Sequence, residues 1–355
     1  MQNKRYPLNG TFELTGRCNL QCRMCLMRVN HARIMETGLH ERTAEEWIHM
    51  AEQVAKEGTI SLLLTGGEPM LRPDFAEIYE AIAKMGFVLN LYTNATMVTD
   101  PIIKLLQKYP PHKIGVTMYG ASNETYQKLC ASSDGYDRFR DGVDKLSSLP
   151  SLFSIRTTIV QDNVNDLAEM RRYTEEKFGP EKVLTVSTFV MNKIRCGIAS
   201  PVECRLTPEE HIRMLFPQII EKWEQTRQGL LPKIKKKLEP QKHSLPQEGQ
   251  YLFESCRAGI DSYAINWSGR MYACEILDKG YTEPFETGFR KAWEDLPEQY
   301  PRSITVEKCR TCPHAYICSS CPAYRLGETG DWFGVPEYAC RTAKFLDQIL
   351  QDVHE

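Results

Sequence analysis

Three cysteines stand close together in the stretch TGRCNLQCRMCLM, residues 15–27: Cys18, Cys22 and Cys25. Thiolates are ligands that zinc and iron–sulfur clusters favour. A closed site needs four protein ligands and disulfides need cysteines in pairs, so three is an unusual number. If three thiolates hold a four-iron cluster, one iron has no protein ligand and can bind a small molecule. A zinc site with a distant fourth ligand is the alternative.

A second set of seven cysteines lies in the last hundred residues: Cys256, Cys274, Cys309, Cys312, Cys318, Cys321 and Cys340. Disulfides are rare in reducing compartments, so clustered cysteines there indicate metal ligands. One alternative is a single zinc site held by Cys309, Cys312, Cys318 and Cys321. That site leaves Cys256, Cys274 and Cys340 without a role. Cys130, Cys196 and Cys204 stand apart, and Cys130 is interpreted as a small buried hydrophobic residue.

The elements that position the first cysteines repeat along the chain. Short apolar, β-branched runs alternate with amphipathic helical stretches; the runs are 10–15, 59–66, 87–94, 112–120, 153–160 and 183–190. Six such units predict an α/β fold with a parallel sheet and crossover helices. The cysteine loop follows the first run, at a strand end where α/β proteins place ligands. Spacing alone leaves an open doubly wound sheet and a partial barrel as alternatives.

Helix starts and a change of composition divide the chain further. Thr43 with Glu46, and Thr207 with Pro208, are typical of helix N-termini. Residues 222–250 are polar and basic with three prolines, which predicts a linker or exposed arm. Its KIKKK run is interpreted as a solvated face, with a peptide- or nucleic-acid-binding patch as the alternative. The piece from 251 onward is too small to bury much core, so metal crosslinks would stabilise it.

Composition excludes several classes of protein. The 355 residues carry a net charge of −2, which gives no basic field for nucleic acid. Apolar runs are too short to span a bilayer, and the N-terminus has no apolar signal segment. The sequence therefore predicts a cytoplasmic protein with neither a nucleic-acid nor a membrane partner.

The spacing Cys-x3-Cys-x2-Cys, followed one unit later by Gly66-Gly67-Glu68-Pro69, resembles the signature of the radical S-adenosylmethionine (radical SAM) superfamily. The resemblance covers the first 190 residues and implies a partial, six-stranded β/α barrel. It implies that S-adenosylmethionine chelates the open iron and is cleaved to a 5′-deoxyadenosyl radical, which abstracts a hydrogen from the substrate. The carboxylate of Glu68 suits an ammonium group, and the two glycines let backbone approach a ligand closely.

The resemblance also implies roles for residues at the later strand ends. Met24 would rest against the adenine of the cofactor, and Thr93, Asn94 and Thr117 would lie near its ribose or methionine end. Arg156 is expected to pair with the cofactor carboxylate, with a plain charge at the sheet rim as the alternative.

The C-terminal cysteines resemble the SPASM extension of radical SAM maturases, which carries two auxiliary four-iron clusters. The resemblance implies that one cluster is held by Cys309, Cys312, Cys318 and Cys340, and the other by Cys256, Cys274 and Cys321. Two residues precede Cys321 where the family usually has three, and a cysteine expected shortly after Cys256 is missing. The latter cluster therefore has either a remote fourth ligand, such as Cys196 or Cys204, or an iron open to substrate.

Two residues are predicted to act on the substrate. Glu275 directly follows Cys274, where sulfatase-maturing relatives have an Asp that serves as base, so Glu275 is a candidate for proton removal. A surface glutamate beside a cluster is the alternative. Tyr119 replaces an Asp common in its motif and is expected to face the substrate cavity.

The predicted activity is hydrogen abstraction from a ribosomally made peptide, leading to crosslinking, epimerisation or oxidation. Alternatives are a sulfatase-type maturase, an aminoglycoside or sugar dehydrogenase, or a non-catalytic iron–sulfur or zinc protein. Seventeen residues precede Cys18, so leader recognition is expected from a separate protein, or from the barrel and the basic arm. Flavodoxin or ferredoxin would supply electrons.

The predicted domains are a radical SAM partial barrel (1–200), a helix and basic linker (201–250) and a small cysteine-rich α+β SPASM domain (251–355). S-adenosylmethionine and three four-iron clusters are the predicted cofactors.

Overall fold

The computed structural model describes residues 4–27, 29, 39–192, 201–215, 256–301, 306–318 and 320–352. The predictions for Cys196 and for the basic arm, including KIKKK, lie outside the described residues. The described residues fall into two compact units: Met1–Cys204 with Phe253–Tyr300, and Arg205–Leu252 with Pro301–Glu355.

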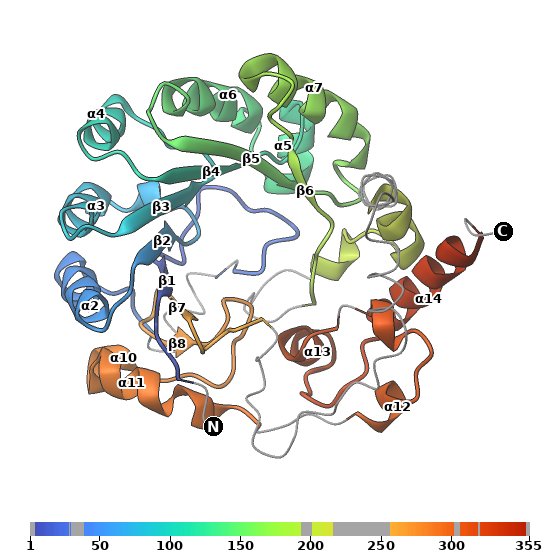
Figure 1. The fold of residues 1–355 in the computed structure, drawn as a ribbon. Coiled ribbons are helices and arrows are strands. Elements are labelled where there is room, and N and C mark those ends of the chain that lie inside the picture. The colour runs from blue at the N-terminus through green and yellow to red at the C-terminus, as the bar shows by residue number, and fades with distance from the viewer. Residues whose placement is uncertain are drawn as a thin grey trace. The chain divides into compact units, whose positions relative to one another are not determined.

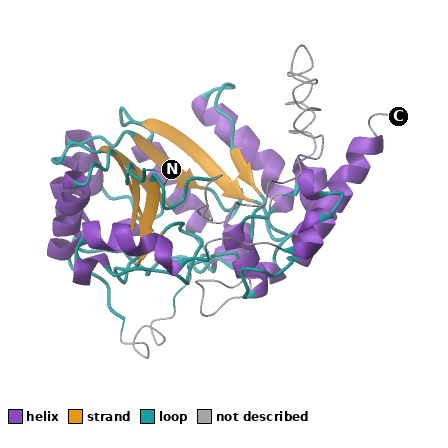
Figure 2. Ribbon diagram, turned by 60° about the horizontal axis from the view of Figure 1, so that its bottom comes forward, coloured by secondary structure: helices purple, strands orange, loops and turns teal. Residues whose placement is uncertain are grey.

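The first unit is built on one eight-stranded sheet in the order β6-β5-β4-β3-β2-β1-β7-β8 (Figure 1). The strands are β1 (Asn9–Glu13), β2 (Ser61–Thr65), β3 (Val88–Thr93), β4 (Lys113–Thr117), β5 (Leu152–Thr158), β6 (Thr185–Ser187), β7 (Ser262–Ile265) and β8 (Met271–Tyr272). All neighbours pair in parallel except β7 and β8, which are antiparallel. The six predicted strands are confirmed as β1–β6, and the sheet is open at β6 and β8. Figure 2 shows the strands side by side as one curved sheet.

Helices return the chain between parallel strands and lie outside the arc of strands (Figure 1). They are α2 (Ala44–Lys56), α3 (Phe75–Ala83), α4 (Asp100–Lys108), α5 (Asn123–Cys130), α6 (Gly135–Leu146) and α7 (Leu167–Phe178), with the 3₁₀ turns η1 (Pro69–Leu71), η2 (Val164–Asp166) and η3 (Pro201–Glu203). The predicted capping box of α2 is confirmed. The Thr43 side chain accepts from the Glu46 amide, and the Glu46 carboxylate accepts from the Thr43 amide.

The two faces of the sheet differ in polarity because side chains alternate along each strand. The outer face is apolar and packs on helices: the Phe12 ring lies 4.9 Å from that of Trp47 in α2, and the Phe153 ring 5.0 Å from that of Phe178 in α7. The inner face carries polar side chains toward the strand ends: Glu13, Thr65, Tyr92, Thr117, Arg156 and Ser187. Apolar burial therefore holds the helices on the outside and leaves a polar interior suited to a ligand.

The segment after residue 256 extends this sheet. β7 pairs with β1, and Tyr263 on its outer face packs 4.9 Å from the Phe289 ring of α11 (Phe289–Asp295). The 3₁₀ turn η4 (Leu296–Gln299) follows α11, and α10 (Pro284–Thr287) precedes it. A Cβ at residue 10 would lie 2.5 Å from the Tyr263 hydroxyl, so Gly10 permits the contact between β1 and β7. Residues 256–300 therefore belong to the same compact unit as the barrel, and residues from 301 onward belong to the other. The predicted domain boundaries stay predictions.

The second unit is built from helices. They include α12 (Glu307–Arg310), η5 (Ala315–Ile317), α13 (Pro322–Thr329) and the 16-residue α14 (Glu337–Asp352). Thr207 and Glu210 exchange the two hydrogen bonds of a capping box, as predicted for the TPEEH stretch. Arg205 lies 3.8 Å over the Tyr338 ring and 2.8 Å from the Glu328 carboxylate. None of the helices in the described ranges has the length and apolar character that crossing a bilayer requires.

Candidate functional site

The cysteine loop follows β1 and is tied to the end of α5. The amide of Gln21 donates to the Cys130 carbonyl at 2.8 Å, and the amide of Arg23 donates to the Leu129 carbonyl at 2.9 Å. Carbonyls in the last turn of a helix have no partner within the helix, so they are free to accept from another segment. The end of α5 therefore supplies a backbone template for the loop that contains Cys18, Cys22 and Cys25.

Hydrogen-bond donors surround the three thiols. The Cys18 sulfur accepts from the Leu20 amide, and the Cys25 sulfur accepts from the Met27 amide, both at 3.4 Å. The Cys22 sulfur lies 3.4 Å from that of Cys130. Donors directed at sulfur stabilise thiolates and are among the features that tune iron–sulfur clusters. The donor set therefore fits a cluster held by this loop.

In the described part of the chain, no three His, Cys, Asp or Glu side chains are placed to hold one metal ion.

The Gly66-Gly67 turn lies directly against the cysteine loop. The Gly67 amide donates to the Thr15 carbonyl at 2.8 Å, and the Glu68 amide donates to the Arg17 carbonyl at 2.9 Å. A Cβ on Gly67 would lie 2.2 Å from the Arg17 carbonyl oxygen, closer than any side chain allows. These glycines were predicted for close approach to a ligand; the structure adds that both are needed for the approach of two loops.

Glu68 is a fully buried carboxylate that accepts several hydrogen bonds. Its donors are the Thr93 hydroxyl at 2.9 Å, the Asn94 amide at 2.8 Å and the Met70 amide at 3.1 Å. Burial raises the pKa of Glu68 to about 7, although these hydrogen bonds act in the opposite direction. A buried carboxylate with such donors is well prepared to bind a cation. Pro69 begins η1 directly after it.

Asn94 connects Glu68 with the cysteine loop. Its side-chain amide donates to the side-chain oxygen of Asn19 at 3.0 Å and lies 3.7 Å from the Cys18 sulfur. The structure therefore brings together Cys18, Glu68, Thr93 and Asn94, which are far apart in the sequence. Asn19 completes this network and was missed by sequence reasoning, although its place beside Cys18 was a usable signal.

Arg156 lies on the inner face of β5, beside Thr117 of β4. Its guanidinium carbon is 3.6 Å from the centre of the Tyr92 ring, which indicates a cation–π contact. A Cβ on Gly115 would lie 2.5 Å from the guanidinium, so the glycine leaves room for this side chain across the strand. Arg156 is thus half-buried on the inner face of the sheet, and its pairing with the cofactor carboxylate stays a prediction.

Met24 and Tyr119 belong to the surroundings of Cys22. Met24 is buried in an apolar cluster that also contains Leu20 and Val160, and Tyr119 packs against this cluster. The Tyr119 carbonyl accepts from the Asn163 side chain at 2.9 Å, which fixes its backbone. The adenine contact of Met24 and the substrate-facing role of Tyr119 stay predictions.

In the second unit, four cysteines influence one another electrostatically. Burial raises the pKa of the Cys340 thiol, and nearby Cys318, Cys309 and Cys312 raise it further. The Arg325 guanidinium also lies 3.4 Å from the Cys309 sulfur. The predicted grouping of Cys309, Cys312, Cys318 and Cys340 around one cluster stays a prediction.

The other predicted C-terminal residues are distributed over both units. The Cys321 sulfur accepts from the Tyr324 amide at 3.3 Å and caps α13 in the second unit. In the first unit, Cys256 is exposed, Cys274 is half-buried and Glu275 is exposed. Their roles stay predictions.

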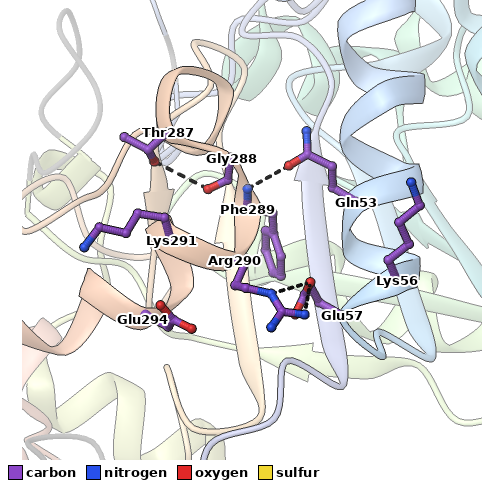
Figure 3. Close-up of a pocket in the computed structure, with 9 residues that line it drawn as sticks. All are labelled: Gln53, Lys56, Glu57, Thr287, Gly288, Phe289, Arg290, Lys291 and Glu294. Carbon is purple, nitrogen blue, oxygen red and sulfur yellow. Dashed lines mark hydrogen bonds and ion pairs between the residues drawn. The ribbon is translucent and has the colours of Figure 1, made fainter.

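A surface pocket between α2 and α11 lies elsewhere in the first unit (Figure 3). The Gln53 side chain accepts from the Phe289 amide at 2.8 Å, and Arg290 pairs with Glu57 at 2.9 Å. Because α2 leads back from the end of β1 to the start of β2, its last turns lie at the edge of the sheet opposite the cysteine loop. We interpret this pocket as a packing seam between α2 and α11.

The raised pKa of Glu68 predicts a pH-dependent stability for the iron-free protein without cofactor. The folded state holds the Glu68 proton more tightly than the unfolded state does. The contribution of Glu68 to the free energy of unfolding is therefore full below pH 4.5 and is lost as the pH rises through about 7. The loss is roughly 3 kcal/mol. Urea unfolding at several pH values should show that E68Q, which keeps an acceptor oxygen, removes this decline.

The exposed Glu77 on α3 provides the control for that measurement. E77Q should follow the wild-type pH profile. A wild-type profile identical to that of E68Q would show that Glu68 is not a buried titrating group.

Comparisons with known proteins agree with this geometry. Residues 12–174 match the radical SAM superfamily. The chain is similar to an AdoMet-dependent heme synthase of Methanosarcina barkeri, 25% identical over 341 residues, covering 92% of this chain and 94% of that one. It is also similar to the subtilosin biosynthesis protein AlbA of Bacillus subtilis, 22% identical over 334 residues, covering 89% and 67%. A PqqA peptide cyclase of Rhizobium meliloti is 30% identical over 132 residues, covering 37% and 34%.

Solved structures share the fold. Streptococcus suis SuiB bound to the precursor peptide SuiA has a TM-score of 0.66 at 16% identity, covering 95% of this chain and 76% of that one. The structure of anSMEcpe with bound AdoMet has a TM-score of 0.67 at 19% identity, covering 98% of both chains. The superfamily match begins within β1 and includes the cysteine loop and the Gly66–Pro69 turn, so residues 12–174 form a radical SAM domain.

Proposed function

We propose that the chain uses Cys18, Cys22 and Cys25 to hold a four-iron cluster and cleaves S-adenosylmethionine to start radical chemistry on a peptide. When bound, the cluster and S-adenosylmethionine supply a 5′-deoxyadenosyl radical. The observation that carries the proposal is the network joining the Cys18 sulfur, Asn94 and the buried carboxylate of Glu68. It unites thiol ligands with a cation-binding group at the carboxyl ends of parallel strands, where α/β proteins bind ligands.

The residues of the chain divide the binding of S-adenosylmethionine between its two charged groups. Glu68 would hold the ammonium group, and the Thr93 hydroxyl and the Asn94 backbone amide keep its carboxylate in place. Arg156, held by the Tyr92 ring, would pair with the cofactor carboxylate from the inner face of the sheet. Thr117 lies beside Arg156 in the sheet and would lie near the ribose or methionine end. Burial of Glu68 excludes water, which strengthens the ion pair.

A peptide is the substrate that we propose first. The relatives include AlbA, the PqqA peptide cyclase and the sporulation killing factor maturation protein SkfB, and SuiB has been solved with a precursor peptide. In this proposal Glu275 removes a proton from the oxidised substrate and Tyr119 lines the substrate cavity. A separate leader-recognition protein and a flavodoxin or ferredoxin complete the system.

Two auxiliary four-iron clusters are part of the proposal. The mutual influence of the Cys309, Cys312, Cys318 and Cys340 thiols supports one of them. The other would use Cys256, Cys274 and Cys321. We assign both clusters to electron transfer away from the substrate, because oxidation of a carbon radical releases an electron that needs an acceptor.

A tetrapyrrole is the second candidate substrate. The match to the heme synthase spans nearly the full length of both chains, and an Fe-coproporphyrin III synthase of the same organism is 21% identical over 328 residues. Sequence reasoning did not consider this class. Iron porphyrins carry carboxylates that Arg156 on the inner face of the sheet could bind instead.

The first test is reductive cleavage of S-adenosylmethionine by the iron-loaded, reduced protein. Loss of a group that supports a metal ligand costs roughly 10–100-fold in activity, so loss of a ligand should cost at least about 100-fold. C18A should therefore form at least about 100-fold less 5′-deoxyadenosine than wild type, and N94A about 10-fold less. Chromatography of the quenched reaction gives the yields. The proposal fails if wild type forms none, or if C18A matches wild type.

The second test counts iron and sulfide after anaerobic reconstitution. Three four-iron clusters predict about twelve irons per chain, and the double variant C309A/C312A predicts about eight. Both proteins should bind S-adenosylmethionine equally, because the cysteine loop is intact. About four irons together with bound zinc in wild type would instead support a zinc site in the second unit.

The third test separates the two substrate classes. Hemin, an iron porphyrin with two propionates, is added to the reduced protein with S-adenosylmethionine, and 5′-deoxyadenosine is measured. A peptide-modifying enzyme should show no stimulation and no shift of the hemin Soret band. A stimulated yield together with a shifted band would overturn the peptide assignment in favour of a tetrapyrrole.

A further inference from the structure

Cys130 lies beside the proposed cluster although it is far from the cysteine loop in sequence. It is the last residue of α5, is fully buried, and its sulfur is 3.4 Å from that of Cys22. From the sequence, Cys130 is interpreted as a small buried hydrophobic residue. The apolar cluster around Cys130, which includes Leu129 and Val160, agrees with that interpretation. The contact between the Cys130 and Cys22 sulfurs also allows a polar role.

The backbone sets the distance between Cys22 and Cys130. The amides on both sides of Cys22, those of Gln21 and Arg23, donate to the Cys130 and Leu129 carbonyls. The Arg23 side chain also pairs with Asp162 at 2.5 Å, which fixes the loop after Cys22. Two hydrogen bonds and an ion pair therefore hold the Cys22 sulfur against the end of α5.

A second donor reaches the same sulfur. The Tyr119 side chain hydrogen-bonds to Cys22, and its ring lies 5.9 Å from that of Tyr126 in an edge-on contact. The Tyr119 amide donates to the Tyr126 hydroxyl at 3.2 Å. Cys22 thus has two hydrogen-bonding neighbours, the fully buried Cys130 and the partly buried Tyr119, and each is fixed by its own contacts.

Binding to iron decides the direction of the hydrogen bond between the two thiols. Cys22 must lose its proton to become a ligand, so it can then only accept. Cys130 is not a ligand in the proposed cluster, so its S–H group, 3.4 Å from the Cys22 sulfur, is the donor that remains. Hydrogen bonds to ligand sulfurs shift the reduction potential of iron–sulfur clusters.

We infer that Cys130 is a positioning residue that donates a hydrogen bond to the Cys22 thiolate and raises the reduction potential of the cluster held by Cys18, Cys22 and Cys25. Tyr119 donates to the same sulfur and also raises the reduction potential of this cluster. The donors withdraw electron density from the ligand and favour the reduced cluster, which is the form that delivers an electron. This inference rests on the proposed function, since it requires a cluster in the cysteine loop.

The test is a redox titration of the iron-loaded protein followed by electron paramagnetic resonance. The signal that changes when S-adenosylmethionine is added identifies the cluster in the cysteine loop. C130A removes the donor, and C130V removes it while filling the space. Both should lower the ratio of reduced to oxidised cluster at a fixed potential by about tenfold, a shift of ~59 mV for one electron. C130S keeps a donor and should stay near wild type.

Val190 supplies the control, because it is buried in the same apolar cluster and its side chain has no hydrogen to donate to sulfur. V190A should leave the potential unchanged, whereas Y119F should lower it. An unchanged potential in C130A and C130V, or an equal shift in C130S or V190A, overturns the inference.

Loss of iron is also a decisive outcome. If C130A and C130V fail to hold iron while C130S holds it, the need for a donor is supported; if C130S also fails, the inference is overturned. A wild-type protein with no signal that responds to S-adenosylmethionine refutes the proposed function itself, which distinguishes the two failures.

Discussion

The close approach of two backbone segments, Gly66–Gly67 and residues 15–17, is the constraint on which the rest of the site depends. With the Gly67 amide bonded to the Thr15 carbonyl, there is no room for a side chain on either glycine. This contact places Glu68 directly beside the loop that begins at Cys18. A carboxylate, an amide side chain and a thiol then meet, although each comes from a different β/α unit.

Burial explains why this small network can be selective. Glu68 has no exposed surface, and its three kinds of donor offset only part of the cost of removing a carboxylate from water. The proposed ammonium group of S-adenosylmethionine would offset the rest of this cost, which a neutral ligand would not do. Arg156 provides the opposite charge farther along the sheet, and Gly115 gives it the space to lie on Tyr92. A zwitterionic ligand matches both groups.

The end of α5 links the sheet with the cysteine loop by a different physical principle. Its last carbonyls have no partners within the helix and accept the loop amides instead. The same turn carries Cys130 and thereby delivers a thiol to Cys22. The end of α5 thus combines hydrogen bonds to its last carbonyls, apolar packing and a sulfur contact.

The sequence by itself determined the alternation of strands and helices, the cysteine spacing and the Gly66–Pro69 turn, because these patterns are local. The six strands, the capping box at Thr43 and the role of Thr207 all follow from short-range periodicity and hydrogen bonding. Only the tertiary structure decided that β7 pairs with β1, that Asn19 joins Asn94, and that Cys130 lies on Cys22. These contacts join residues far apart in the chain or depend on side-chain direction, and hydrophobic periodicity carries no information about which distant surfaces meet.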